Sequence, residues 1–106
     1  MKLIHAAIGA ALTLAAPASA QTGDAAIGAE LAVEYCARCH DVAAGGAFKT
    51  FPPSFASIAA FRGPDQIVAR IWFPATHSLM PQMMNLLSRE DVDNLTAYIV
   101  SLETAQ

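Results

Sequence analysis

The chain has few charged residues and few cysteines, and each scarcity excludes a class of protein. Lys and Arg number 6 and Asp and Glu number 9, so the formal net charge is −3. Proteins that bind nucleic acid need a basic surface, so we expect no nucleic-acid partner. The only two cysteines, Cys36 and Cys39, enclose a loop too short to brace a fold. A disulfide framework is therefore excluded.

The first 20 residues have the composition of a secretory signal peptide. Lys2 gives a positive start, residues 3–16 are apolar and rich in alanine, and residues 17–20 are small. An uncleaved membrane anchor is the alternative, but this apolar run is shorter than the about 20 residues that cross a bilayer. We expect cleavage after Ala20, export to the periplasm and no stable membrane insertion afterwards. Residues 21–106 then form one domain.

The mature chain is too small to build an ample core from its own side chains. Removing 20 of the 106 residues leaves 86, and the loss of Lys2 takes the formal charge from −3 to −4. Domains of this size usually need a staple, a metal or a cofactor. The sequence therefore leads us to expect a core that is completed by a bound group.

Apolar periodicity predicts an all-α domain of three to five helices, with no strand. The predicted helices cover 24–39, a short stretch at 55–61, a segment from Gly63 that ends by Pro74, and a last helix from Ser88. Residues 74–87 contain two prolines and read as a loop. The apolar positions predicted to share a helix face are Ile27, Leu31 and Tyr35, then Ile67, Val68, Ile71 and Trp72, then Val92, Leu95, Ile99 and Leu102, with Tyr98 beside them.

Residues suited to helix capping stand where these helices begin. Asp24 is an N-cap residue, Pro64 fits the first helical position, and Ser88 with Asp91 three residues later forms a variant capping box.

Cys36-Ala37-Arg38-Cys39-His40 is a C-x-x-C-H sequence, the attachment signature of c-type haem. Each thiol adds across one haem vinyl group, and the two intervening residues let both sulfurs reach neighbouring vinyls. The histidine that follows supplies an imidazole nitrogen to the iron. We therefore predict one covalent haem c, with its iron, bound by Cys36, Cys39 and His40.

Two other chemistries use similar residues. A thioredoxin-like pair also has the C-x-x-C spacing, but it lies near a strand–helix unit, and no strand is expected here. Structural zinc needs four ligands, which Cys36, Cys39, His40 and His77 would supply at irregular spacing. The export signal and the helical pattern favour haem.

The second iron ligand is expected in the loop before the last helix, which contains Met80, Met83 and Met84. Methionine is a common gap-filler in cores, but Met80 precedes Pro81 in a stiff loop. A thioether ligand favours reduced iron and raises the potential. We rank Met80 first, then Met83 and Met84. His77, which would give a bis-histidine iron, is a rival, and an open sixth site is a further alternative.

With these motifs, the mature chain resembles the class I cytochrome c family in its short bacterial form. Gly28 lies eight residues before Cys36, and Leu95-Thr96-Ala97-Tyr98-Ile99 is similar to the family's last-helix pattern. The resemblance implies the cytochrome c fold, in which Gly28 of the first helix closely meets Leu95 and Tyr98 of the last.

The same resemblance implies roles for residues around the haem. Pro52-Pro53-Ser54-Phe55 resembles the family's proline loop, in which the carbonyl of Pro53 accepts the other ring N–H of His40. Trp72 and the run from Pro74 to Pro81 resemble the segment that leads to the methionine ligand, here Met80. Trp72 either donates its indole N–H to a haem propionate or is a plain core aromatic.

These features predict a non-enzymatic electron carrier that passes single electrons between redox protein partners that the sequence does not identify. An alternative is a haem subunit of a larger periplasmic oxidoreductase, whose docking face would include Phe48, Phe51 and Phe73. A haem sensor or enzyme would need an open sixth site, and apart from His77 we see no base or acid placed for peroxide chemistry.

Overall fold

The described part of the chain is helical. The computed structural model describes residues 22–48, 51–74, 80 and 85–105. These residues form helices and turns with no β-strand, so the predicted all-α fold is confirmed. No helix within these residues is long and apolar enough to cross a membrane. The elements are α1 (Ala25–Leu31), a π-helical turn (Ala32–Cys36), α2 (Phe55–Phe61), α3 (Pro64–Trp72), α5 (Arg89–Ser101) and a 3₁₀ turn (Leu102–Ala105).

The helices begin where capping chemistry predicts. The Asp24 carboxylate accepts from the backbone N–H groups of Ala26 and Ile27, at 2.8 and 3.1 Å. Pro64 is the first residue of α3. At the start of α5, the Ser88 hydroxyl accepts from the Asp91 N–H at 3.1 Å, and an Asp91 oxygen accepts from the Ser88 N–H at 2.7 Å. These hydrogen bonds satisfy donors that an uncapped helix leaves free.

Loss of the α5 cap is expected to weaken the whole domain. Ser88→Ala removes the oxygen that accepts from Asp91, and we expect the free energy of unfolding to fall by about 1 kcal/mol. Ser88→Thr keeps a hydroxyl acceptor and should retain most of that stability. Denaturant titration followed by circular dichroism measures both variants. An equal loss of stability in Ser88→Ala and Ser88→Thr would contradict the capping role of the Ser88 hydroxyl.

The first helix differs from the expected range of 24–39. Its α-helical hydrogen bonds give way at Ala32 to a π-helical turn, in which the Ala37 N–H donates to the Ala32 carbonyl at 3.0 Å. The helical backbone ends at Cys36, and residues 37–39 form turns. The chain turns here because the Cys36 carbonyl accepts from both Cys39 N and His40 N. The prediction therefore placed the end of the helix three residues too late.

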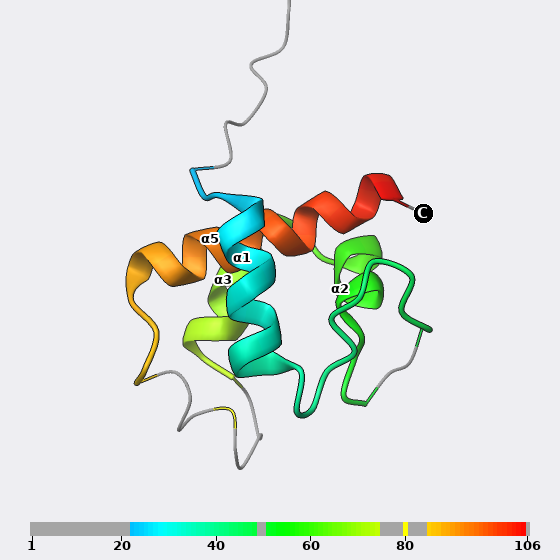
Figure 1. Ribbon diagram of the computed structural model, residues 1–106, viewed down its shortest axis with the longest axis horizontal. Helices are drawn as coiled ribbons and strands as arrows, with labels where there is room; N and C mark the ends of the chain where they lie inside the picture. Colours follow the sequence, from blue (N-terminus) through cyan, green and yellow to red (C-terminus); the bar gives the residue numbers. More distant parts are fainter. Residues whose placement is uncertain (1–21, 49–50, 75–79, 81–84, 106) are drawn as a thin grey trace, which may run out of the picture.

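α1 packs most extensively against α5, and the two helices cross in Figure 1. A Cβ on Gly28 would overlap the carbonyl group of Asn94 and would come within 2.8 Å of the Tyr98 Cβ. The predicted approach to Tyr98 is confirmed, but the closest backbone is that of Asn94 rather than Leu95. Leu95 instead turns its side chain into the core and is 1% exposed. The Asn94 side chain also accepts from Asp24 N at 2.7 Å, which fixes the start of α1 against α5.

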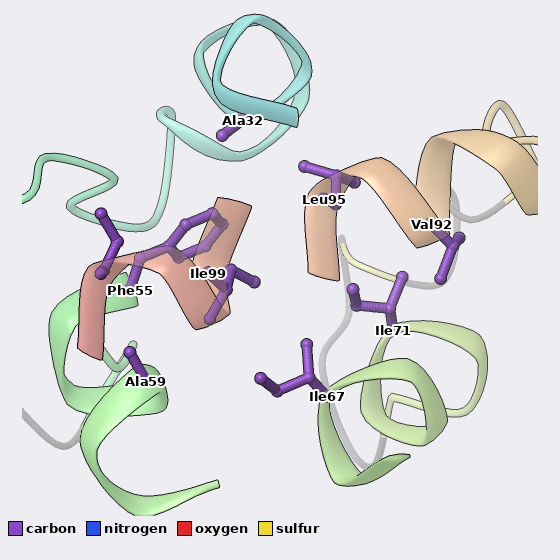
Figure 2. Close-up of a cluster of buried hydrophobic side chains, with 9 residues drawn as sticks. Ala32, Phe55, Ala59, Ile67, Ile71, Val92, Leu95 and Ile99 are labelled. Carbon is purple, nitrogen blue, oxygen red and sulfur yellow. The ribbon is translucent and has the colours of Figure 1, made fainter. Parts of the chain in front are cut away.

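The core lies between α5 and the three other helices. Figure 2 shows Ile67 and Ile71 of α3 pointing toward the α5 side, where Val92 and Leu95 lie, while Phe55 of α2 lies beside Ile99. Every apolar position predicted for the inner faces of α3 and α5 is buried or packs against this cluster. These are Ile67, Val68, Ile71, Trp72, Val92, Leu95, Ile99 and Leu102, with Tyr98 also packed against it. Ala32, the first residue of the π-helical turn after α1, is fully buried and belongs to the same cluster.

Candidate haem site

The two cysteines and the histidine occupy one tight turn directly after the first helix. The backbone N–H groups of Cys39 and His40 both donate to the Cys36 carbonyl, at 3.1 and 2.9 Å. This turn therefore brings the side chains of Cys36, Cys39 and His40 to one end of the first helix, with Cys36 at the edge of the core. Cys36 packs against the hydrophobic cluster, whereas Cys39 is exposed. Both cysteines are free thiols.

The described residues do not assemble the four-ligand site that the zinc alternative needs. Burial, and secondarily the proximity of Cys39, raises the pKa of the Cys36 thiol to about 11. The Cys36 side chain therefore lies among apolar groups at the edge of the hydrophobic cluster. No group of three His, Cys, Asp or Glu side chains in the described ranges is arranged to hold a metal ion. His77, the fourth ligand in that alternative, lies outside the described residues.

His40 is held through one ring nitrogen. Its Nδ1 lies 2.6 Å from the carbonyl oxygen of Pro53. A carbonyl oxygen only accepts, so Nδ1 carries a proton, and in the neutral imidazole the lone pair is then on Nε2. The structure gives Nε2 no hydrogen-bond partner among the residues it describes. The ring is thus oriented, and in the correct tautomer, to bind a metal through Nε2.

The backbone after His40 is anchored from two sides. The Phe55 N–H donates to the Asp41 carbonyl at 2.8 Å, and the Tyr98 hydroxyl donates to the Val42 carbonyl at 2.6 Å. Burial, and secondarily the Asp41 carboxylate, raises the pKa of Tyr98, so its hydroxyl remains a donor. Sequence reasoning missed the bond to Val42. A tyrosine on the flank of the last helix was the only signal for it.

Of the remaining predicted site residues, the structure describes Trp72 and Met80. Trp72 ends α3 and packs against the hydrophobic cluster, half-buried. Met80 is half-buried with helical backbone geometry. Its rivals Met83, Met84 and His77 lie outside the described residues. The choice of sixth ligand and the contact of Trp72 with a propionate therefore stay predictions.

The residues at this site suit a covalently attached haem. Two free thiols lie one turn apart, one of them against the core, and the next residue presents an imidazole nitrogen with an available lone pair. Apolar side chains of α2, α3 and α5 line the same region, as a hydrophobic macrocycle requires. When bound, haem supplies an iron that changes by one electron. The protein's own groups hold the ring and orient the imidazole.

Comparison with known proteins gives the same assignment. Residues 23–99 match the family described as cytochrome C oxidase, cbb3-type, subunit III. A cytochrome c-552 from Bradyrhizobium diazoefficiens is 42% identical over 87 residues, which cover 79% of this chain and 80% of that protein. No solved structure matches the chain.

The chain therefore belongs to the cytochrome c family, as a small bacterial c-type cytochrome. Members of this family bind haem c covalently, so the cofactor prediction is confirmed, and Cys36 and Cys39 are consistent with its attachment. The protein is a haem-containing electron carrier.

Proposed function

We propose that this cytochrome is exported and carries single electrons through a haem attached at Cys36 and Cys39, with His40 and Met80 as the axial iron ligands. The hydrogen bond between His40 Nδ1 and the Pro53 carbonyl is the observation that best supports the proposal. It fixes the tautomer and direction of the imidazole, as in metal-ligating histidines generally. The protein then does no chemistry on a substrate. It holds the haem in apolar surroundings and lets electrons enter and leave.

Two permanent ligands would suit this task, because an iron that keeps six ligands in both oxidation states reorganises little on electron transfer. A thioether ligand also stabilises ferrous iron and raises the potential relative to two histidines. Met80 is half-buried and follows α3, whose end at Trp72 packs against the core. That placement supports Met80 as the partner of His40.

Met80→Ala is expected to lower the reduction potential by on the order of 0.1 V or more, within the about 0.8 V range that axial ligands span. The weak long-wavelength sulfur-to-iron band of the ferric protein should disappear with it. Potentiometry with optical detection measures both quantities. Met83→Ala and Met84→Ala are matched controls in the same loop and should keep the band. Loss of the band in either control, with its retention in Met80→Ala, would reassign the ligand.

Export predicts a defined mature terminus. Residues 1–20 have the order of charge, apolar run and small residues that signal peptidases recognise. We expect the mass of the purified protein to equal that of residues 21–106 plus one haem. Intact-protein mass spectrometry measures this directly. A haem-loaded chain that still carries residues 1–20 would favour the anchored alternative.

A second candidate is a haem subunit of a larger oxidoreductase complex. The matched family is described as an oxidase subunit, and several large apolar side chains are exposed. Phe48 and Phe61 are 58% and 74% exposed, with their ring centroids 6.1 Å apart, and Phe51 and Phe73 are each 80% exposed. Contiguous exposed apolar side chains, such as the neighbouring rings of Phe48 and Phe61, often mark a docking face. Gel filtration of the native protein in mild detergent separates the candidates, since a free carrier elutes alone and a subunit elutes with oxidase activity.

A further inference from the structure

We propose that Tyr98 is a positioning residue for the haem ligand His40, and that it acts on both ends of the hydrogen bond between His40 and Pro53. The inference rests on the proposed function only in taking His40 as an iron ligand. Among the described residues, the Tyr98 hydroxyl bonds to Val42 and not to the imidazole or the Pro53 carbonyl. Its contacts are with the residues that follow each of them.

The first contact is with the segment after His40. The Tyr98 hydroxyl donates to the carbonyl of Val42 at 2.6 Å, and Val42 is two residues beyond His40. This bond joins residues 56 positions apart in the chain. It ties the backbone that carries the imidazole to α5, which is the longest helix in the described part of the structure.

The second contact is with the segment after Pro53. The rings of Tyr98 and Phe55 lie 6.3 Å apart in a tilted arrangement, and Phe55 is two residues beyond Pro53. Phe55 in turn lies 5.7 Å from the imidazole of His40, and its N–H donates to the Asp41 carbonyl at 2.8 Å. One side chain therefore supports the backbone of both the donor and the acceptor of the His40–Pro53 bond.

Tyr98 itself is held at a defined place. Its Cβ lies at the crossing of α1 and α5, where only the absence of a side chain at Gly28 leaves room for it. The crossing thus sets the position of the phenol ring, and the ring sets the position of the segment after His40. The hydrogen bond from His40 Nδ1 to the Pro53 carbonyl is of the type that orients a ligating histidine and raises its basicity. A looser Nδ1–H···O bond makes the imidazole a weaker electron donor, which favours ferrous iron.

The test compares Tyr98→Phe with Thr96→Val in the haem-loaded protein. Tyr98→Phe keeps the ring and removes only the donor to Val42. Thr96→Val removes a buried hydrogen bond of the same kind on the same helix, from Thr96 Oγ1 to the Val92 carbonyl at 2.8 Å, which does not involve residues 40–42. Each variant removes one hydrogen bond from a side-chain hydroxyl to a backbone carbonyl, and only the bond of Tyr98 reaches the segment after His40.

Proton NMR of ferrous protein labelled with ¹⁵N-histidine gives the exchange rate of the His40 Nδ1 proton, and potentiometry gives the reduction potential. In Tyr98→Phe we expect exchange to accelerate roughly two- to tenfold, as for the loss of one neutral hydrogen bond, and the potential to rise. Faster exchange or a higher potential than in Thr96→Val supports the inference, and a change of either quantity in the opposite direction overturns it. If neither quantity changes beyond that control, Tyr98 is structural only. If wild-type His40 lacks the large upfield shifts of a haem-bound imidazole, the proposed ligation itself is wrong.

Discussion

Replacing Cys36 and Cys39 together with alanine is expected to abolish covalent haem in the exported protein. Both thioether bonds are lost, and the imidazole of His40 would be the only attachment left in the motif turn. The effect should extend to folding. The mature chain is small, and its hydrophobic cluster depends on a few side chains from α1, α2, α3 and α5. Without the macrocycle, the apolar region beside Cys36 has nothing of comparable size to pack against.

Haem staining after denaturing electrophoresis measures the attachment, and circular dichroism measures the helix content. Arg38→Ala is the matched control, because Arg38 lies between the cysteines, is exposed, and leaves both thiols in place. We expect full haem staining in that control and none in the double variant. Covalent haem in the double variant would show that Cys36 and Cys39 are not the attachment sites.

Gly28→Ala is expected to lower the free energy of unfolding by about 3 kcal/mol, the upper part of the usual range for overpacking. The new Cβ would overlap the Asn94 carbonyl group and crowd the Tyr98 Cβ at 2.8 Å. Two of the three nearest atoms are backbone atoms in the middle of α5, so they cannot rotate away. α1 would have to move off α5, which would also disturb the Asp24–Asn94 hydrogen bond.

The sign of the stability change in Gly28→Ala distinguishes helix crowding from helix propensity. Helix propensity alone would make alanine about 1 kcal/mol more stable than glycine inside α1. A net loss of stability in Gly28→Ala would therefore come from the close contact between α1 and α5 and not from helix propensity. Gly45→Ala is the control, since a Cβ at Gly45 meets nothing within 4 Å and no described glycine has a positive φ. Denaturant unfolding of the ferric protein measures both variants. A Gly28→Ala protein as stable as the wild type would contradict the close crossing.

Local chemistry explains why much of the fold was predictable. The starts of α1, α3 and α5 follow from short-range hydrogen bonds and from the fixed φ of proline. The residues responsible are Asp24, Pro64 and Ser88, and their partners lie no more than three residues away. The inner faces of α3 and α5 follow from apolar spacing in the same way. Such features need no knowledge of the partner helix.

Features that depend on distant groups were predicted less well. The first helix ends at Cys36 because the motif turn draws two N–H groups onto one carbonyl, which periodicity does not report. The partner of Gly28 was placed one residue away, at Leu95 rather than Asn94, because the contact depends on how α5 is rotated. The bond from Tyr98 to Val42 spans 56 residues and has no local signal. The His40–Pro53 pairing was expected from the family resemblance and not from the spacing of these residues.

The absorption spectrum of the purified, exported protein, recorded in the ferric and then the ferrous state, reports both the haem and its two axial ligands. We expect a low-spin c-type haem spectrum in both states, with a weak long-wavelength sulfur-to-iron band in the ferric form and no change on adding carbon monoxide. A high-spin spectrum that responds to carbon monoxide would contradict His40/Met80 ligation and indicate an open iron site. A protein without any haem spectrum would contradict the assignment as a cytochrome.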